Sequence, residues 1–347
     1  DERGRRSGGC LGFIIKKLLK LIAILLAIAI LCAGVLYVVP IGFWNVQPRD
    51  NDLAINGDLP ADRLNVLLLG LVLTTSKING VSGWFQFLDR TFQPSELAKL
   101  ALIITLSKAL TKYPDRPIPN FRYFIYICMH FGIPALLILL QPDIGTLMVF
   151  CVIFVALLFV SGFEMRWMIT LGCLVSAAIT PVIFYLASTN NFRWLRLVAF
   201  MNPESDPTGS SYQIVNSKIT IGSGGLYGKG AWSEGTLTHL NYVPENHTDF
   251  IFSVVGETLG FVGALVLLTL YAFVIYRMLL LAFHTNDKFG QLIIVGVMAM
   301  LVFHVYENIG MCIGVMPITG IPLPFISYGG TNLVVNMAGV GLVLNVT

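Results

Sequence analysis

The sequence predicts an all-α, polytopic membrane protein with about eight transmembrane helices and one long, folded extracellular loop. Of its 347 residues, 56% are hydrophobic and only 12% are charged, whereas soluble proteins carry about 25% charged residues. The mean hydropathy is +0.77. Several apolar runs continue for the roughly 20 residues that a spanning helix needs, whereas the strands of a membrane barrel would alternate. This composition excludes a soluble enzyme, a disordered chain and a nucleic-acid-binding domain.

The first 70 residues contain one predicted membrane anchor. Residues 1–17 are basic and rich in glycine and serine, and residues 18–39 form an apolar run long enough to span. No small-residue cleavage site follows the run, so we expect an uncleaved anchor whose basic flank lies in the cytoplasm. Residues 40–63 are polar and predicted to be extracellular, and the apolar stretch 64–73 is too short to cross a bilayer.

Seven further spans are predicted from the remaining apolar runs. They lie near residues 94–111, 122–140, 144–161, 165–187, 250–283 and 289–316, and from 325 to the end. The short loops on the inner side would then carry most of the remaining basic charge, as the positive-inside rule requires. These basic residues are Lys108, Lys112, Arg116, Arg122, Arg166, Arg277 and Lys288. Eight spans with both ends inside is the self-consistent count.

Two irregular segments fall on the outer side of this topology. The long loop 188–249 is too rich in aromatic and apolar residues to be disordered, so it is predicted to form a folded extracellular cap. Residues 317–330 (PITGIPLPFISYGG) are crowded with proline and glycine. Non-helical backbone at membrane depth is tolerated only against protein or a water-filled cavity. This segment is therefore predicted to line a cavity that opens outward.

Ionisable residues in or beside spans are candidates for function because their insertion is costly. Glu96 and Lys99 are three residues apart at the outer start of a span, so they share a helix face. They are predicted either to form a structural ion pair or to present a cation to an anionic ligand. Asp143 is predicted to cap the next outer helix start. Glu307 is predicted to be buried and paired, with His304 on the same face.

Asp249 ends the long loop and opens the next span. At helical spacing it would share a face with Ser253 and Glu257 and act as a helix N-cap. Alternatively, its carboxylate, ionised at the membrane surface beside His247, is suited to accept a proton as a general base. In the preceding loop, Arg193, Arg196 and Lys218 are either solvated charges or a group of cations for a phosphate or diphosphate.

Six motifs made of these residues resemble, in order from about residue 70 to the end, the SEDS family of shape, elongation, division and sporulation proteins. The motifs are QPSELAK (93–99), QPDIGT (141–146), NPESDPTGSSYQ (202–213), SKITIGSGGLYGKG (217–230), ENHTDFIFSVVGE (245–257) and ENIGMCIGVMPITGIPLPFISYGG (307–330). The PITGIPLPF sequence is more similar to the elongation branch of the family, RodA, than to the division branch, FtsW.

The resemblance implies a polymerase that joins lipid II units on the outer face of the bacterial cytoplasmic membrane. It also implies a class B penicillin-binding protein as transpeptidase partner. By this match the catalytic aspartate is Asp249, the family's Glu/Lys pair is Glu96 and Lys99, and its loop arginine is Arg196. The residues expected to contact the substrate or its diphosphate are Glu96, Lys99, Asp143, Arg196, Lys218 and His247. Assistance from a divalent cation, Mg²⁺ or Mn²⁺, is left open.

The chain departs from the family at its start. SEDS proteins usually have ten spans, and residues 1–70 instead weakly resemble the start of a LytR-CpsA-Psr family protein. We therefore divide the chain into residues 1–70 and a SEDS-like bundle, 71–347. The usual arginine before the tryptophan of the first outer loop is replaced in GVSGW (80–84). Two alternatives to a polymerase stay open: a flippase for lipid-linked oligosaccharides, and an inactive truncated or chimeric scaffold.

Overall fold

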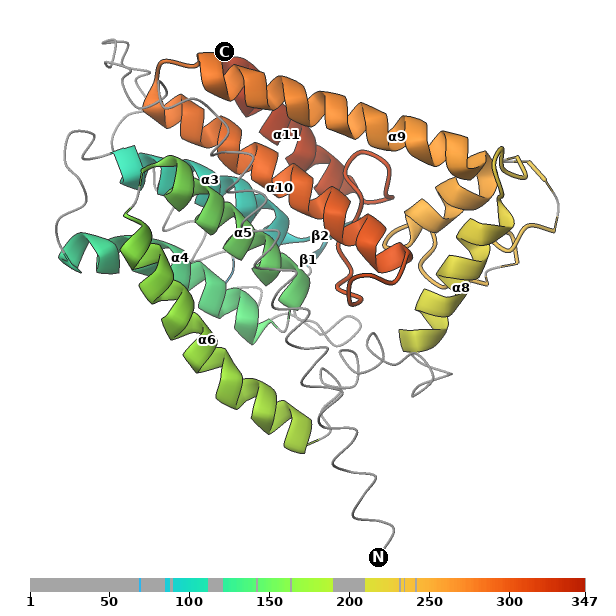
Figure 1. Cartoon of the computed structure of the whole chain (residues 1–347), viewed down its shortest axis with the longest axis horizontal. Helices are drawn as coiled ribbons and strands as arrows, with labels where there is room; N and C mark the ends of the chain where they lie inside the picture. Colours follow the sequence, from blue (N-terminus) through green and yellow to red (C-terminus); the bar gives the residue numbers. More distant parts are fainter. Residues whose placement is uncertain are drawn as a thin grey trace, which may run out of the picture.

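The computed structural model describes most of the chain after residue 84, as a bundle of helices with one small hairpin (Figure 1). The described residues are 69, 85–87, 90–111, 121–141, 143–162, 164–189, 210–230, 232–233, 235–240 and 242–346. The helices are α3 (Pro94–Thr111), α4 (Phe121–Leu140), α5 (Ile144–Val160), α6 (Met165–Ser188), α8 (Ser210–Ser223), α9 (Ile251–His284), α10 (Lys288–Cys312) and α11 (Gly330–Val346).

The predicted all-α class is confirmed, and each of the seven spans predicted after residue 90 is a helix with nearly the predicted bounds. Within the described residues, the helices at 123–140, 251–284 and 288–312 are long and apolar enough to cross a membrane, and shorter apolar helices accompany them. The predicted anchor at 18–39 and the apolar stretch 64–73, apart from Leu69, lie outside the described residues.

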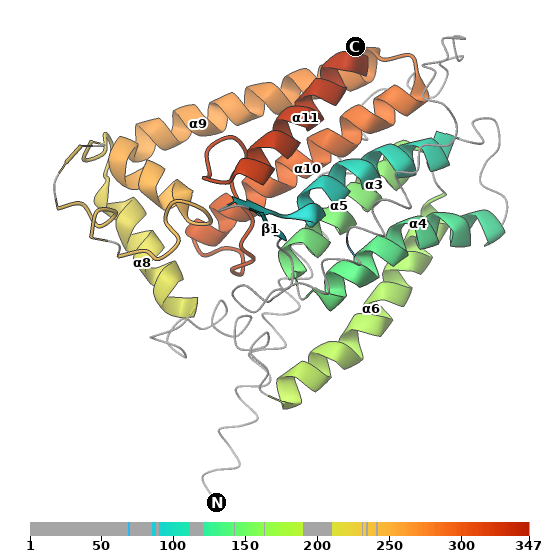
Figure 2. The same ribbon diagram turned by 180° about the vertical axis from the view of Figure 1, so that it is seen from behind.

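A two-stranded hairpin is the one strand structure in the part of the chain that the structure describes. Strands β1 (Phe85–Phe87) and β2 (Arg90–Phe92) pair antiparallel, with Phe85 opposite Phe92. The hairpin lies just before α3 and contacts the start of α11 (Figure 2). It was not predicted, because three-residue strands give too short an alternation to stand out from a loop.

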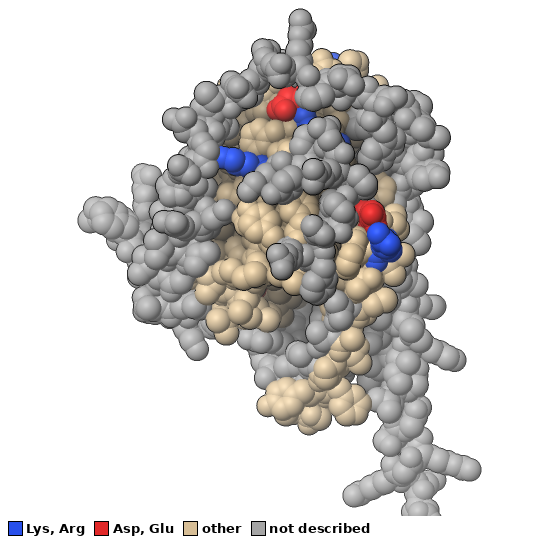
Figure 3. All heavy atoms as spheres, turned by 90° about the vertical axis from the view of Figure 1, so that its left-hand side faces the viewer, with Lys and Arg blue, Asp and Glu red and all other residues tan. Residues whose placement is uncertain are grey.

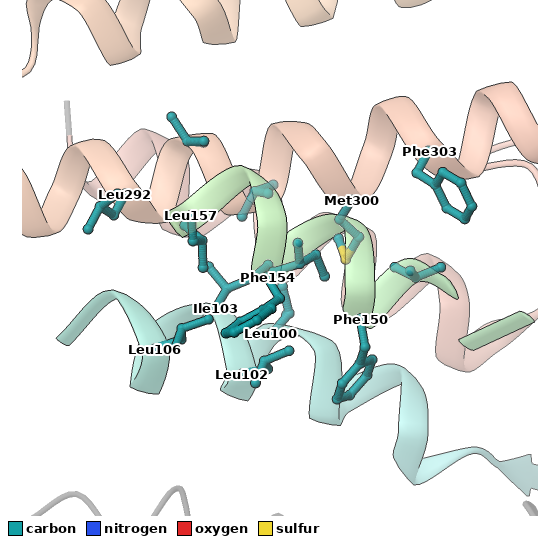
Figure 4. Close-up of a cluster of buried hydrophobic side chains, with 14 of the residues drawn as sticks. Leu100, Leu102, Ile103, Leu106, Phe150, Phe154, Leu157, Leu292, Met300 and Phe303 are labelled. Atoms are coloured by element: carbon teal, nitrogen blue, oxygen red, sulfur yellow. The ribbon is translucent and has the colours of Figure 1, made fainter. Parts of the chain in front are cut away.

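Helix α10 is the centre of the bundle. It packs against α3, α5, α9 and α11, and 78% of its most apolar stretch is buried, against 6% for α9. Figure 4 shows the core between α3, α5 and α10. The side chains labelled there are Leu100, Leu102, Ile103, Leu106, Phe150, Phe154, Leu157, Leu292, Met300 and Phe303. Because α9 exposes most of its apolar surface, it is the lipid-facing helix of this pair.

Helix α10 ends at Cys312 because of the residues that follow it. Gly314 adopts a left-handed conformation (φ +71°), and the amides of Val315 and Met316 donate back to the carbonyl of Gly310. This arrangement satisfies carbonyls at the helix end, and Pro317 then cannot extend the helix. The chain stays irregular until α11 begins at Gly330, which confirms the predicted non-helical segment.

Helix α9 is broken at Gly260, which has φ +66° inside the helix. The first part of α9 therefore lies at an angle to the rest, beside α8 (Figure 1). The glycine-rich residues 225–230 pair with the break. The amides of Lys229 and Gly230 donate to the carbonyls of Glu257 and Thr258, and the carbonyls of Gly225 and Leu226 accept from Phe261 and Val262. The backbone groups freed by a break in a membrane helix must be satisfied in this way. We call α8, the glycine-rich turn and the described residues that follow as far as Val243 the cap.

The two ends of the bundle differ in what they carry. One end holds the hairpin, α8, the start of α9 and the irregular segment after α10 (Figures 1 and 2). The opposite end, where α9 joins α10, carries small separate groups of charge among the described residues (Figure 3). An ion pair of Arg166 with Glu164 and the N-cap Asp287 lie at that end. Its basic side chains agree with the predicted cytoplasmic side.

Candidate active site at the outer end of the bundle

Asp249 lies in the turn 244–250 that leads into α9, and it is half-buried. A β-carbon added at Gly320 would lie 3.3 Å from its Oδ2 atom, so the carboxylate stands beside the irregular segment after α10. The predicted N-cap position is wrong: the N-cap of α9 is Phe250, whose side chain makes no capping hydrogen bond. Because Asp249 precedes the helix, it does not share a helix face with Ser253 and Glu257.

The backbone around Asp249 is held by α10. The side-chain amide of Asn308 donates to the carbonyl of Asp249 at 2.7 Å and to the carbonyl of Ile321 at 2.8 Å. Asn308 is fully buried, and the Cys312 Sγ lies 3.9 Å from the same Asp249 carbonyl. A single amide on the central helix therefore joins the turn 244–250 to the segment 317–329.

Two more contacts join these segments. The hydroxyl of Ser327 donates to the carbonyl of Thr248 at 2.6 Å and accepts from the amide of Leu323 at 2.7 Å. The amide of Tyr328 donates to the carbonyl of His247 at 2.9 Å. The His247 side chain is exposed beside this junction. These bonds fix Asp249 and His247 relative to a segment about 70–80 residues further along the chain.

Helix α8 brings Lys218 to the same junction. The hydroxyl of Ser217 donates to the carbonyl of Cys312 at 2.8 Å. The neighbouring Lys218 is exposed, and a β-carbon added at Gly314 would lie 2.5 Å from its Nζ atom. Its ammonium therefore lies over the turn that ends α10, at the end of the bundle where Asp249 is held.

Asp143 caps α5, as the sequence predicts. Its carboxylate accepts from the Thr146 amide at 3.0 Å, from the Thr146 hydroxyl at 2.7 Å and from the Gln93 side-chain amide at 3.2 Å. The first turn of α5 also touches the irregular segment, because a β-carbon on Gly145 would lie 2.7 Å from the carbonyl of Thr319. Only glycine fits at this contact.

Glu96 and Lys99 form the predicted ion pair, and His304 completes it. The Lys99 ammonium lies 2.8 Å from both Glu96 carboxylate oxygens and 2.9 Å from His304 Nε2. His304 Nδ1 lies 2.6 Å from the carbonyl of Met300. Since a carbonyl only accepts, Nδ1 carries the hydrogen and Nε2 accepts from lysine. Lys99 is 1% exposed, which favours the structural interpretation of the pair.

Glu307 is buried without a cation among the described residues. It is fully buried, and its Oε1 accepts from the Thr319 hydroxyl at 2.9 Å. No described group bonds to its Oε2. The predicted pairing therefore exists, but its partner is a hydroxyl of the irregular segment.

Sequence reasoning missed the role of Glu257 in the cap. Its buried carboxylate accepts from the Lys229 ammonium at 2.9 Å, from the amides of Leu237 and Thr238 at 2.9 Å each, and from the Thr238 hydroxyl at 2.6 Å. Ser223 adds a longer bond of 3.3 Å. A carboxylate within an apolar run and a lysine within a glycine cluster were the available signals.

Two predictions, the role of Arg196 and a possible divalent cation, are not tested by the described residues. Arg196 falls in the segment 190–209, outside the described residues. In the parts of the chain that the structure describes, no group of three His, Cys, Asp or Glu side chains could hold a metal ion.

The apolar bundle and its one-sided polar site define an integral membrane protein with its candidate chemistry at one end. The chain belongs to the FtsW/RodA/SpoVE family of cell cycle proteins, whose profile matches residues 63–347. It is 38% identical over 281 residues to the peptidoglycan glycosyltransferase MrdB of Escherichia coli K12, covering 81% of this chain and 75% of the relative. It is 34% identical over 268 residues to a probable peptidoglycan glycosyltransferase FtsW of a Geobacter species, covering 77% and 71%.

Solved structures agree with this assignment. A structure described as a peptidoglycan synthase complex that coordinates polymerization and crosslinking matches with a TM-score of 0.67 and 31% identity, covering 93% of this chain and 87% of that one. The rod shape determining protein RodA of Thermus thermophilus matches with a TM-score of 0.57 and 33% identity, covering 82% and 75%. The predicted resemblance to the SEDS family, with its RodA-like character, is confirmed, as is the enzyme class of glycosyltransferase.

Proposed function

We propose that this chain is a peptidoglycan glycosyltransferase of cell elongation and shape, which polymerises lipid II at the outer face of the bacterial cytoplasmic membrane. The named relatives and structural neighbours support the polymerase activity. The observation that carries the mechanism is the placement of Asp249, a half-buried residue whose backbone carbonyl accepts a hydrogen bond from Asn308 near the end of the central helix.

In the proposed reaction, Asp249 acts as the general base. The C4 hydroxyl of one lipid II disaccharide attacks the anomeric carbon of the other substrate from the face opposite the diphosphate. The hydroxyl proton passes to the Asp249 carboxylate, a new C–O bond forms, and the bond to the diphosphate breaks with its electron pair. The product is inverted at the anomeric carbon, and undecaprenyl diphosphate leaves. No protonating acid is needed, whereas hydrolysis of a glycoside requires a second carboxylate.

Cations at the same end would stabilise the charge that develops on the diphosphate. Lys218 suits this role because its ammonium is exposed beside Gly314, and we assign Arg196 to the same role from the family resemblance. His247 is exposed and lies two residues before Asp249, so we assign it to contact with the substrate. We assign a supporting role to Glu96, Lys99 and Asp143. Their polar atoms bond within the bundle, so they hold in place the helices that carry the site. A divalent cation would bind through the substrate diphosphate, and none of these steps requires it.

The one-sided arrangement favours polymerisation over flipping. A flippase must offer a polar path to both faces of the membrane, whereas Asp249, Lys218 and the segment 317–329 gather at one end of the bundle. Movement of labelled lipid II across the bilayer of proteoliposomes, without polymer formation, would favour the flippase over the polymerase.

The test is polymerisation of labelled lipid II by the purified chain and by Asp249→Asn. We expect the variant to lose about 10²–10⁴-fold in rate, the usual contribution of a general base. Asp287→Asn is the matched control, because Asp287 caps α10 at the opposite end and asparagine is an equally good cap. Wild-type rates from Asp249→Asn would refute the assigned role, and an inactive parent chain would favour the scaffold alternative.

The proposed partner is a class B penicillin-binding protein, supported by the neighbouring synthase complex that couples polymerization to crosslinking. Polymerisation measured with and without a purified transpeptidase of this class tests the pairing. A stable complex that raises the rate or changes the glycan length supports it, and independent behaviour of the two proteins would contradict it.

A further inference from the structure

Three strongly exposed large side chains of the cap lie in its glycine-rich turn, 225–230, or two residues after it. Tyr227 is 82% exposed, Leu226 is 64% exposed, and Trp232 is 93% exposed. We call these three residues the aromatic tip. A tryptophan or tyrosine left almost wholly in water forgoes the burial that usually stabilises it, so the aromatic tip requires another environment.

Backbone bonds fix the height of the glycine-rich turn, with Leu226 and Tyr227, along α9. The carbonyls of Gly225 and Leu226 accept from the amides of Phe261 and Val262 at 2.9 and 3.0 Å. A β-carbon on Gly260 would lie 2.3 Å from the amide nitrogen of Gly228, so the turn is in direct contact with the break. Leu226 and Tyr227 therefore cannot move along α9 without losing these bonds. Trp232 follows two residues after Gly230, whose amide donates to the carbonyl of Thr258 at 3.0 Å.

The length of α9 places the break at the outer edge of the membrane. The helix has 34 residues, about 51 Å at 1.5 Å per residue, whereas the hydrocarbon core is ~30 Å thick. Arg277 is exposed near the inner end, and its guanidinium must reach the inner interface. The stretch from Gly260 to Arg277 rises ~26 Å, so Gly260 lies close to the outer boundary of the hydrocarbon.

The surface of the aromatic tip continues into the lipid-facing surface of α9. Directly after the break, Phe261 is 61% exposed and Leu265 is 52% exposed. These residues stand on a helix whose apolar stretch is only 6% buried within the protein. The tip thus extends a lipid-contacting surface at the depth where tryptophan and tyrosine concentrate in membrane proteins.

We infer that the aromatic tip inserts into the interface of the outer leaflet and anchors the cap to the lipid bilayer. The polar cap would then be held at a fixed height above the membrane by Leu226, Tyr227 and Trp232. The glycine-rich turn supplies the close approach to α9, and the apolar side chains supply the affinity for lipid.

The test is the fluorescence of Trp232 in proteoliposomes without any partner protein. Its signal is the difference between the parent chain and Trp232→Phe, and Trp167→Phe is the control because Trp167 stacks on Phe124 within the bundle. We expect blue-shifted emission that is quenched by lipids brominated high on the acyl chain, more than by lipids brominated near its end or by aqueous iodide. The additional change Tyr227→Ser is expected to weaken the lipid quenching without changing the Trp167 signal.

Emission typical of water, quenched by iodide and insensitive to brominated lipid, would overturn the inference. The same result followed by protection from iodide on adding a transpeptidase would also overturn it, because the aromatic tip would then be a protein-docking surface.

Discussion

At the scale of single residues, the buried ionisable side chains differ in how many hydrogen-bond partners they have. Lys99 has close partners in Glu96 and His304, whereas Glu307 bonds through one of its two oxygens. The Lys99 ammonium lies within 2.9 Å of both Glu96 carboxylate oxygens and of His304 Nε2, so its positive charge is paired with a carboxylate. Taking such charges out of water costs several kcal/mol per ion, and only close contacts repay it. The three side chains therefore depend on one another.

Replacing Lys99 with methionine should be more harmful than removing the whole pair. Lys99→Met leaves the Glu96 carboxylate buried without its cation, and we expect a loss of about 3–5 kcal/mol in the free energy of unfolding. The double variant Glu96→Gln/Lys99→Met should recover a large part of this loss. Unfolding in detergent for both single variants and the double variant gives the coupling energy. Additive losses would contradict the interdependence.

The hydrogen bond between Thr319 and the buried Glu307 can be tested by comparing the stability of two variants. Thr319→Val removes the hydroxyl that donates to the buried Glu307 Oε1 and should cost about 1–3 kcal/mol. Glu307→Gln keeps an oxygen to accept from Thr319 and removes a buried charge, so its stability should match or exceed the parent's. Thermal unfolding distinguishes the two variants. A large loss from Glu307→Gln together with a neutral Thr319→Val would show that a different group satisfies the carboxylate.

The sequence predicted these residues only in part. The Glu96–Lys99 pair follows from spacing within one helix, and Asp143 from its place at a helix start. The contact of Lys99 with His304 spans 205 positions and depends on how α3 packs against α10, which spacing does not reveal. Asp249 was identified by its motif, but its place outside α9 depends on the turn that Asn308 holds.

At the scale of elements, the break in α9 depends on glycine at two contacts. Gly260 has φ +66°, and a β-carbon on Gly228 would lie 2.2 Å from the carbonyl of Thr258. Gly260→Ala should therefore cost about 1–3 kcal/mol, because a positive φ with extended ψ is a conformation that only glycine adopts readily, and it should loosen residues 225–230. Gly172→Ala is the control, because nothing lies within 4 Å of the added carbon. Hydrogen exchange of the cap provides the measurement, and unchanged protection in Gly260→Ala would refute this dependence.

Helix positions follow closely from hydropathy because each apolar run is bounded by turn residues. The bounds of α3, Pro94–Thr111, agree with the prediction to the residue, since proline suits the first turn of a helix. The break in α9 was not predicted, because its freed backbone groups are satisfied by residues 225–230, which lie about 30 positions earlier in the sequence. The local sequence, GETLGF (256–261), contains no proline and does not by itself indicate a break.

At the scale of the whole molecule, the polar groups separate the bundle into two functional ends. Asp249, Lys218 and the cap lie where α10 ends, whereas Arg277 and Lys288 lie where α10 begins. Such separation is expected of a membrane protein with its candidate site on one side, since short loops rich in lysine and arginine stay on the cytoplasmic side. The hydropathy pattern predicted the separation, because parity alone assigns each loop to a side once the number of spans is known.

This orientation predicts opposite labelling of two exposed positions. Asn286 lies in the turn between α9 and α10, and Leu240 lies in the cap with 65% exposure. In spheroplasts, a membrane-impermeant thiol reagent should label Leu240→Cys and spare Asn286→Cys, and inverted vesicles should give the opposite pattern. The parent chain sets the background, since the four described cysteines all lie within helices and form no disulfide with one another. Labelling of both variants from the same side would place both ends of the bundle on one face and remove the basis for an outward-facing Asp249.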